Sequence, residues 1–476
     1  MLVEVTVDKR LSGAGIRLSG WSRANLPRTL RFADRTVTLS RVQLMTGQGR
    51  AKKGVQSQLV LSVSPAIATT LRLPKQQCRL CSDEAEGDWR LGPCFAVYAR
   101  TTSDEQRRFG EQTQLFEDLS VEAGRRGVDL VVIGPGFRQS HQGWRYDTSS
   151  HSWRTCLLPT PDGVIRRSGA FARRDQETAR ADLAWFSRTA RLHTLPATCS
   201  NKFFFYQLLK SVPQLRPFAP RSTVATNALQ VWRAVLNRNH VYVKPVTGAQ
   251  GVSVVRLDRE GKRVRASWEV SSASRAKPLV KDGTPIGHEV SGAVRPMSVR
   301  SQVFDGIAGF RQFWQGTGLK RCLVQDTVPL PTTRYGQPFD LRWLIQSVDE
   351  PMIMARVARV GQGGAVTTNI HTGGEAVDAV TLLREQLGGT RASQVIRELD
   401  HAALAVANEL TRRFGQFAEA GLDMALRDDD TLAIFEVNPT PGRRMLRQLS
   451  PDLREMSLVT LLEYAIHATG FTASVD

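Results

Sequence analysis

The chain has 476 residues, 41% of them hydrophobic and 23% charged, and a formal net charge of +19. This length accommodates about two to four domains with sizeable cores, and the composition excludes a disordered or fibrous protein. The basic excess favours anionic partners such as nucleotides, acidic polymers or nucleic acid, or else forms a solvated basic surface. Without an aromatic RNA-binding pattern, a recognition helix or a zinc finger, the sequence argues against a nucleic-acid binder.

The N-terminus and the cysteines bear on where the protein is located and on whether it holds a structural zinc ion. No signal-peptide pattern opens the chain, and no apolar run reaches the length of a membrane span, about 18 residues, so we expect a cytoplasmic protein without a membrane span. Cys78 and Cys81, with Cys94 beyond them, have a zinc-like spacing. A structural zinc site needs four ligands, and no second pair follows, so the spacing indicates coincidence.

Residues 1–88 contain short runs typical of strands, separated by Gly, Pro and Ser. Examples are Met1–Val5, Thr36–Leu39 and Leu59–Val63. This pattern predicts a β-rich N-terminal domain.

Residues 89–194 have the order of an α/β unit. A strand over Phe95–Ala99 is followed by helical apolar spacing over Gln112–Arg126 and by a buried strand over Val128–Ile133. The segment Gly163–Arg174 then carries four arginines, at positions 166, 167, 173 and 174. These arginines either receive an acidic substrate or are simply solvated.

Residues 195–476 form the largest predicted domain, in which helices and strands alternate. Helices are expected over Asn201–Lys210, Val377–Leu387, Asp400–Phe414 and, as one or two helices, Leu449–Thr469. The fold class is therefore an α+β or α/β multidomain protein.

Two segments of this domain carry residues suited to phosphate. Val241–Val255 reads as a strand, a glycine loop and a second strand, with Lys244 at the end of the first strand and Gly248 and Gly251 in the loop. Glycines let backbone N–H groups approach phosphate oxygens, although an ordinary β-turn has the same pattern. Further on, Asp340 and Arg342 share a strand face, as a structural salt bridge or as a phosphate site.

The hairpin over residues 421–442 carries the most specific constellation. In an antiparallel register in which paired residue numbers sum to 859, Asp423 lies opposite Glu436. Asn438, two residues further on, lies on the same strand face as Glu436. Two carboxylates and an amide oxygen are hard ligands that suit Mg²⁺. A charged surface hairpin is the alternative, but Glu436 interrupts an apolar strand, where an unpaired carboxylate would be costly.

Taken in order, these motifs resemble the ATP-grasp superfamily and, within it, the YheC/YheD-type endospore coat-associated proteins. The resemblance covers about residues 90–470. It implies a pre-ATP-grasp α/β domain over residues 89–194 and a two-lobed ATP-grasp domain over residues 195–476.

The resemblance also implies roles for individual residues. Many relatives have Glu where Gln325 stands, which weakens a side-chain contact there, and spacing to Asn369 favours Arg359 over Arg356 as the family's arginine. The implied nucleotide-binding residues are Lys202, Lys244, Gly248, Gly251, Gln325, Asp326 and Val328; the implied catalytic residues are Arg342, Arg359 and Asn369; the implied metal ligands are Asp423, Glu436 and Asn438.

The resemblance implies an ATP-dependent ligase that uses Mg²⁺, as two ions, and joins a carboxylate to an amine through an acyl phosphate. The substrate class is open and includes an acidic polymer or peptide. A structural spore-coat protein with a vestigial or regulatory ATP site is the alternative, and spore-coat association would then replace a purely cytoplasmic location. The presence of all three metal ligands and both lysines argues against decay.

Overall fold

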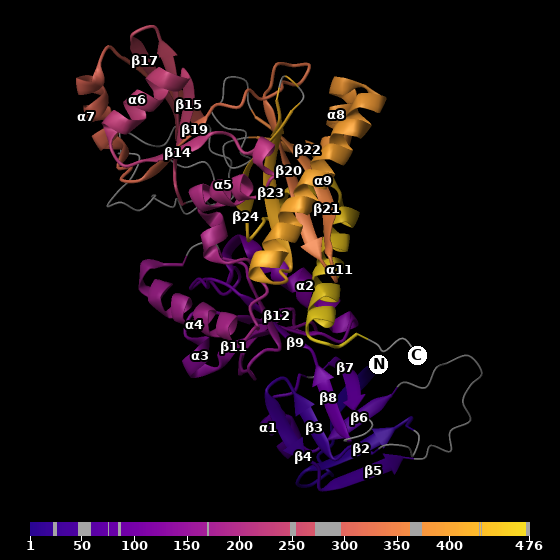
Figure 1. The fold of residues 1–476 in the computed structure, drawn as a ribbon. Coiled ribbons are helices and arrows are strands. Elements are labelled where there is room, and N and C mark those ends of the chain that lie inside the picture. Colours follow the sequence, from indigo (N-terminus) through magenta and orange to yellow (C-terminus); the bar gives the residue numbers. More distant parts are fainter. Residues whose placement is uncertain are drawn as a thin grey trace. The chain divides into compact units, whose positions relative to one another are not determined.

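The structure is a computed structural model that describes residues 1–21, 26–45, 59–74, 76–83, 87–168, 171–247, 254–271, 297–361, 374–427, 429 and 431–472. The chain forms two compact units. The first comprises Met1–Thr194, Ser347–Glu350 and Glu455–Asp476, and the second comprises Leu195–Gln346 and Pro351–Arg454. Elements of both units are labelled in Figure 1.

The first unit begins with an eight-stranded mixed sheet, which confirms the predicted β-rich N-terminal region. The strand order is β4-β3-β8-β7-β1-β6-β2-β5, and helix α1 (Pro65–Leu71) contributes Ile67 and Leu71 to the core of this unit. The strands are β1 (Leu2–Val7), β2 (Gly15–Ser19), β3 (Thr29–Phe32), β4 (Arg35–Thr38), β5 (Arg41–Met45), β6 (Val60–Val63), β7 (Gln77–Asp83) and β8 (Asp88–Gly92).

A second sheet of the first unit has the order β12-β11-β10-β9-β13, and both β10 and β13 run parallel to β9, which lies between them. Every residue of β9 and β10 is buried, and most are Val, Ile, Leu or aromatic, as expected for strands covered on both faces. Its strands are β9 (Cys94–Tyr98), β10 (Asp129–Ile133), β11 (Gln142–Asp147), β12 (Ser152–Leu157) and β13 (Gly163–Arg166); the helices are α2 (Thr113–Arg125), α3 (Phe137–Ser140) and α4 (Gln176–Arg188).

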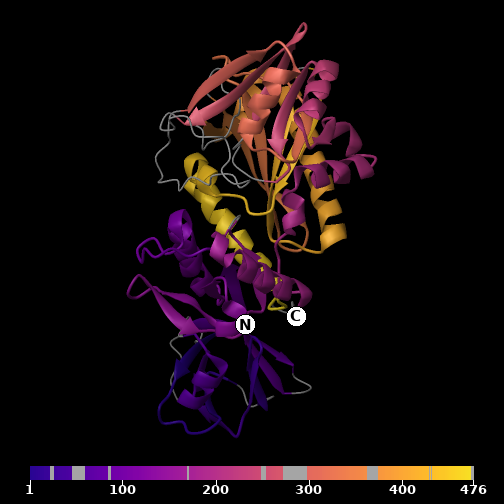
Figure 2. The same ribbon diagram turned by 90° about the vertical axis from the view of Figure 1, so that its left-hand side faces the viewer.

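The C-terminal helix α11 (Pro451–Ala468) returns to the first unit, beside the purple elements in Figures 1 and 2. Glu463 accepts a hydrogen bond from Arg126 at the end of α2, with 2.9 Å between Oε1 and Nη1. Tyr464 is buried, and its hydroxyl lies 2.9 Å from Nδ1 of His193. The first unit is therefore assembled from both ends of the chain.

The second unit contains a six-stranded antiparallel sheet in the order β14-β19-β15-β16-β17-β18. Helices α6 (Ala228–Arg238) and α7 (Ile307–Thr317) pack against it through Trp232 and Phe310, whose ring centroids lie 5.4 Å apart. The strands are β14 (Ser222–Ala225), β15 (His240–Pro245), β16 (Val255–Glu260), β17 (Arg263–Ser271), β18 (Met297–Phe304) and β19 (Cys322–Asp326).

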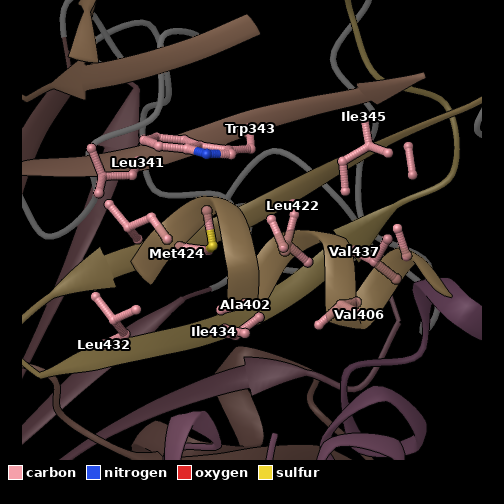
Figure 3. Packing of buried hydrophobic residues seen from close by; sticks show 14 of the residues in the cluster. Leu341, Trp343, Ile345, Ala402, Val406, Leu422, Met424, Leu432, Ile434 and Val437 are labelled. Carbon is pink, nitrogen blue, oxygen red and sulfur yellow. The ribbon is translucent and has the colours of Figure 1, made fainter. Parts of the chain in front are cut away.

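The other sheet of the second unit has the order β22-β21-β20-β23-β24. Helix α9 presents Ala402 and Val406 to one face, where Trp343, Leu422 and Met424 complete the core shown in Figure 3. The strands are β20 (Phe339–Ser347), β21 (Pro351–Val360), β22 (Glu375–Asp378), β23 (Glu419–Leu426) and β24 (Leu432–Asn438); the helices are α5 (Lys202–Ser211), α8 (Ala379–Leu387), α9 (Gly389–Phe414) and α10 (Arg444–Leu449).

Candidate active site

The β23–β24 hairpin has the predicted register over Gly421–Asp423. Asp423 pairs with Glu436, and Gly421 pairs with Asn438. The register shifts after Asp423, because Met424 pairs with Ile434 and leaves Phe435 as an extra residue. This β-bulge changes the phase of the strand, so that Ile434 lies in the apolar core while Glu436, two residues later, does not.

Charged residues occupy part of the sheet face opposite α9. Leu341 and Trp343 of β20 belong to the core, so the alternating positions Asp340 and Arg342 face the other way. Leu422 and Met424 place Asp423 on the same side. The pattern of core residues therefore brings acids and arginines from neighbouring strands together.

Arg359 of β21 links the two buried aspartates. Its guanidinium donates Nε to Asp340 Oδ1 and Nη2 to Asp340 Oδ2, both at 2.6 Å, and Nη2 also donates to Asp423 Oδ2 at 3.1 Å. Arg342 donates Nε to the other oxygen of Asp423. The expected pair between Asp340 and Arg342 is thus replaced by pairs across the strands.

The charges of this network hold one another in the ionised state. Burial alone would raise the pKa of Asp423, but Arg342 and Arg359 outweigh it and hold that pKa at about 2. Burial likewise acts to lower the pKa of Arg359, and Asp340 and Asp423 overcome this and raise it. Gly421 leaves room for the network, since a Cβ there would lie 3.0 Å from Arg342 Nη1.

Arg356 and Arg359 lie in different surroundings, although they are three residues apart on β21. Arg356 donates Nη2 to Oδ2 of Asp400 on α9 at 2.6 Å, and Trp343 Nε1 donates to the same carboxylate at 2.7 Å. Arg356 therefore ties the helix to the sheet, whereas Arg359 lies in the charged network.

The two candidate lysines approach the charged face from other elements. Lys202, at the start of α5, has Nζ 2.9 Å from Glu436 Oε2. Helix α5 begins there because the side chain of Asn201 accepts hydrogen bonds from the N–H groups of Phe203 and Phe204, the contacts of an N-cap. A cation thus already neutralises Glu436.

Lys244, at the end of β15, donates Nζ to Gln325 Oε1 at 3.0 Å. Gln325 is 3% exposed, and its amide nitrogen donates to Ser222 Oγ at 3.1 Å. The amide therefore serves as both acceptor and donor, which a glutamate could not do when ionised.

Burial lowers the pKa of Lys244 to about 8, with Lys202 acting in the same direction and Glu436 opposing both. The ring of Phe435 lies 5.3 Å from the Lys244 ammonium. Phe435 was missed in the sequence analysis, because the bulge that turns it toward Lys244 leaves no mark in the residue pattern.

Asp326 ends β19 and Val328 follows it, in the segment that the family resemblance implies is the hinge beside the adenine. Asp326 Oδ1 lies 3.4 Å from Arg238 Nη1. Val328 is buried with Ala425 and Ala433, and Leu330 and Phe435 pack against them. An apolar cluster therefore lies beside the lysines and the acids.

The oxygen donors Asp423, Glu436 and Asn438 fit a Mg²⁺ site by type and by strand position. Arg342 and Arg359 contact the two oxygens of Asp423, and Lys202 contacts Glu436. Asn438 Oδ1 accepts from the Thr440 N–H at 3.0 Å.

Some predicted residues cannot be compared with the structure. Gly248, Gly251 and Asn369 lie outside the described residues. In the described ranges the cysteines are free, and no three His, Cys, Asp or Glu side chains form a metal-binding group. No helix within the described ranges is long and apolar enough to cross a membrane.

Lysines beside a hinge and acids on a facing hairpin are the arrangement expected for an ATP-grasp protein, and comparison with known proteins agrees. The model of the YheC/D like ATP-grasp family matches residues 192–467, so the chain belongs to this family. The endospore coat-associated protein YheC of Bacillus subtilis (strain 168) is 18% identical over 314 residues, which are 65% of this chain and 78% of that protein.

Two solved structures are similar to this chain at low sequence identity. The ATP-grasp ligase PsnB with a minimal precursor matches with 13% identity and a TM-score of 0.44 over 79% of this chain and 100% of that one. D-alanyl-alanine synthetase A from Vibrio cholerae matches with 9% identity and a TM-score of 0.42 over 78% of this chain and 98% of that one.

Proposed function

We propose that the protein is an ATP- and Mg²⁺-dependent ligase that joins a carboxylate to an amine through an acyl phosphate. The observation that supports it best is the charged cluster of the second unit. Its acids are Asp340, Asp423 and Glu436, and its bases are Lys202, Lys244, Arg342 and Arg359. Family membership makes ATP the expected ligand of such a cluster.

The lysines are the proposed phosphate ligands. Lys202 is held by Glu436 and Lys244 by Gln325, and both ammonium groups can exchange these partners for phosphate oxygens without a change of fold. Gly248 and Gly251 would add backbone N–H groups from their loop. The backbone of Gln325 and Asp326 and the side chain of Val328 would meet the adenine.

Asp423, Glu436 and Asn438 are the proposed Mg²⁺ ligands. Bound Mg²⁺, as one or two ions, would neutralise charge on the transferred phosphoryl group. Movement of Lys202 to the phosphates would leave Glu436 available for the metal. The chain therefore exchanges one cation for another at the same carboxylate.

The chemistry consists of two displacements. A substrate carboxylate oxygen attacks the γ-phosphorus, the bond to ADP breaks, and an acyl phosphate forms. The amine nitrogen then attacks the acyl carbon. The bond between this carbon and the phosphate oxygen breaks, phosphate leaves with the electron pair, and the nitrogen loses a proton. Arg342, Arg359 and Asn369 would hold the developing negative charge through charge-assisted hydrogen bonds, in an orientation that Asp340 fixes by its two bonds to Arg359.

The test is ADP release from ATP across a panel of carboxylates and amines, with mass spectrometry of the products and parallel ATP titrations with and without EDTA. We expect release to require one carboxylate, and EDTA to weaken ATP binding strongly. ATP binding without turnover on any acceptor would favour a regulatory site in a structural, coat-associated protein. Equal ATP affinity with and without EDTA would refute the metal assignment.

We place the active enzyme in the cytoplasm.

A further inference from the structure

The first unit contains a second candidate site, at the carboxyl ends of its parallel strands. Strand β9 is the middle one of three parallel strands, with β10 on one side and β13 on the other. Connections that leave neighbouring parallel strands toward opposite sides open a crevice at the carboxyl edge, where α/β proteins bind ligands. The residues at this edge therefore decide what such a crevice can hold.

Arginines stand at the ends of β9 and β13. Arg166 pairs with Tyr98 in the parallel register, so alternation places Arg100 and Ser168 on the same side as these two. Ser168 Oγ accepts a hydrogen bond from the Arg100 N–H at 2.7 Å and joins the two strand ends. Arg167, the neighbour of Arg166, points to the opposite side and is 6% exposed.

A buried carboxylate fixes the base of this edge. Asp182 of α4 is 0% exposed, and its Oδ2 accepts from the Tyr98 hydroxyl at 3.0 Å and from the Gly136 N–H after β10 at 2.8 Å. Phe171 packs edge-on against Tyr98, with ring centroids 5.6 Å apart. The exposed residues Arg173 and Arg174 follow two and three positions after Phe171.

Arg166 differs from Arg145, another half-buried arginine of the same sheet. Arg145 makes a two-nitrogen ion pair with the buried Asp129, at 2.8 Å for Nη2 and 3.1 Å for Nε. In the described ranges Nε of Arg166 is buried without a hydrogen-bond partner, and no ion pair involves its side chain. Burial lowers the pKa of Arg166, as expected for a guanidinium that no nearby carboxylate compensates.

An uncompensated, half-buried guanidinium is costly for a fold unless a ligand supplies the counter-charge. The acids closest in sequence give little compensation: Asp175 lies 3.7 Å from Arg174, and Glu177 is exposed on the first turn of α4. We propose that Arg100, Arg166, Arg173 and Arg174 form a basic edge that binds the carboxylates of an acidic peptide.

The arginines are distributed over a strand end, a loop and a helical turn, so they match several carboxylates along a chain better than one small anion. The inference deepens the proposed function, since the bound peptide would be the carboxylate substrate. Binding at the basic edge needs only residues of the first unit, however, so it can be measured without nucleotide and without turnover.

The experiment measures the affinity of a fluorescently labelled oligoglutamate peptide for the full chain, by anisotropy, without ATP and at two salt concentrations. R100Q/R166Q should weaken binding at least about tenfold, the effect of losing one charge-assisted contact. The matched control R154Q/R188Q removes the same charge from exposed positions on β12 and α4, and should change the affinity less than about twofold. Thermal unfolding verifies that all variants are folded.

Equal losses in both double variants would show diffuse attraction by the net charge and overturn the proposal, as would unchanged affinity in R100Q/R166Q. Competition with inorganic phosphate separates the ligand classes: displacement of the peptide at lower concentrations of phosphate than of unlabelled oligoglutamate would also refute a carboxylate site. ATP binding by R100Q/R166Q should match the parent. Peptide binding in a protein that never releases ADP would leave the basic edge intact and refute only the ligase.

Discussion

The charged cluster of the second unit and the basic edge of the first use the same side chain in opposite ways. Arg342 and Arg359 are each bonded to buried aspartates, so their positions are set by the fold itself. Arg166 lies half-buried without such a bond among the described residues. A compensated arginine is held in place before a ligand arrives, whereas an uncompensated one stabilises a complex by gaining its first counter-charge.

The comparison is sharpest within β21, which supplies one arginine to each face of its sheet. R359M should destabilise the second unit by about 3–5 kcal/mol, because Asp340 and Asp423 would remain buried without their shared partner. R356M should cost about 1 kcal/mol or less, because Asp400 is partly exposed and retains the bond from Trp343. Denaturant unfolding of the two variants measures the difference, and similar losses would contradict the network.

At the hairpin, E436Q should reduce ADP release at least about a hundredfold while the fold is retained, since a ligand charge disappears with little change in volume. The matched control is D429N in the exposed turn of the same hairpin. A parent-like rate in E436Q would place the site elsewhere, and an equal loss in D429N would indicate damage to the hairpin.

Removal of the Lys244 ammonium tests the phosphate assignment. K244A should weaken ATP binding by about 1–3 kcal/mol, the range for a hydrogen bond to a charged group. K210A, which changes a lysine in the last turn of α5, should leave ATP affinity unchanged. Calorimetric titration of both variants decides, and parent-like affinity in K244A would exclude Lys244 as a phosphate ligand.

The smallest expected effect concerns an uncharged buried base in the first unit. Burial lowers the pKa of His193 from 6.5 to about 4, so between these pH values the unfolded chain binds a proton that the folded chain does not. Stability therefore falls as the pH falls through this window. Through His193, the free energy of unfolding falls by less than about 1 kcal/mol at pH 6 and by about 2 kcal/mol at pH 5, relative to neutral pH.

H193Q should remove this acid sensitivity and flatten unfolding free energy against pH between 6.5 and 4, even if its stability at pH 7 is lower. H151Q changes an exposed histidine between β11 and β12 and serves as the control. A slope in H193Q as steep as the parent's would assign the acid sensitivity to other groups.

Local patterns were sufficient to predict much of the fold. The residue pattern over Asn201–Lys210 predicted α5, and alternation with a short polar turn predicted the pairing of Asp423 with Glu436. Each of these depends on residues close together in the sequence. Family resemblance, rather than any local pattern, supplied the nucleotide assignments.

Contacts between distant residues could not be predicted in the same way. Asp340 pairs with Arg359 and Asp423 with Arg342, which depends on the order of strands in the sheet. The return of α11 to the first unit joins residues more than 250 positions apart, such as His193 and Tyr464. Neither helical nor strand periodicity carries that information, because it describes one element at a time.

The single extra residue at Phe435 makes the length of β24 as important as its composition. Deleting Phe435 would rotate either Glu436 and Asn438 toward the apolar core or Leu432 and Ile434 away from it, because one step along a strand exchanges its faces. Insertions are best tolerated in the turn after Arg427, outside the paired residues. An alignment of relatives that places its gap inside β24 instead of in this turn would compare residues from opposite faces of the sheet.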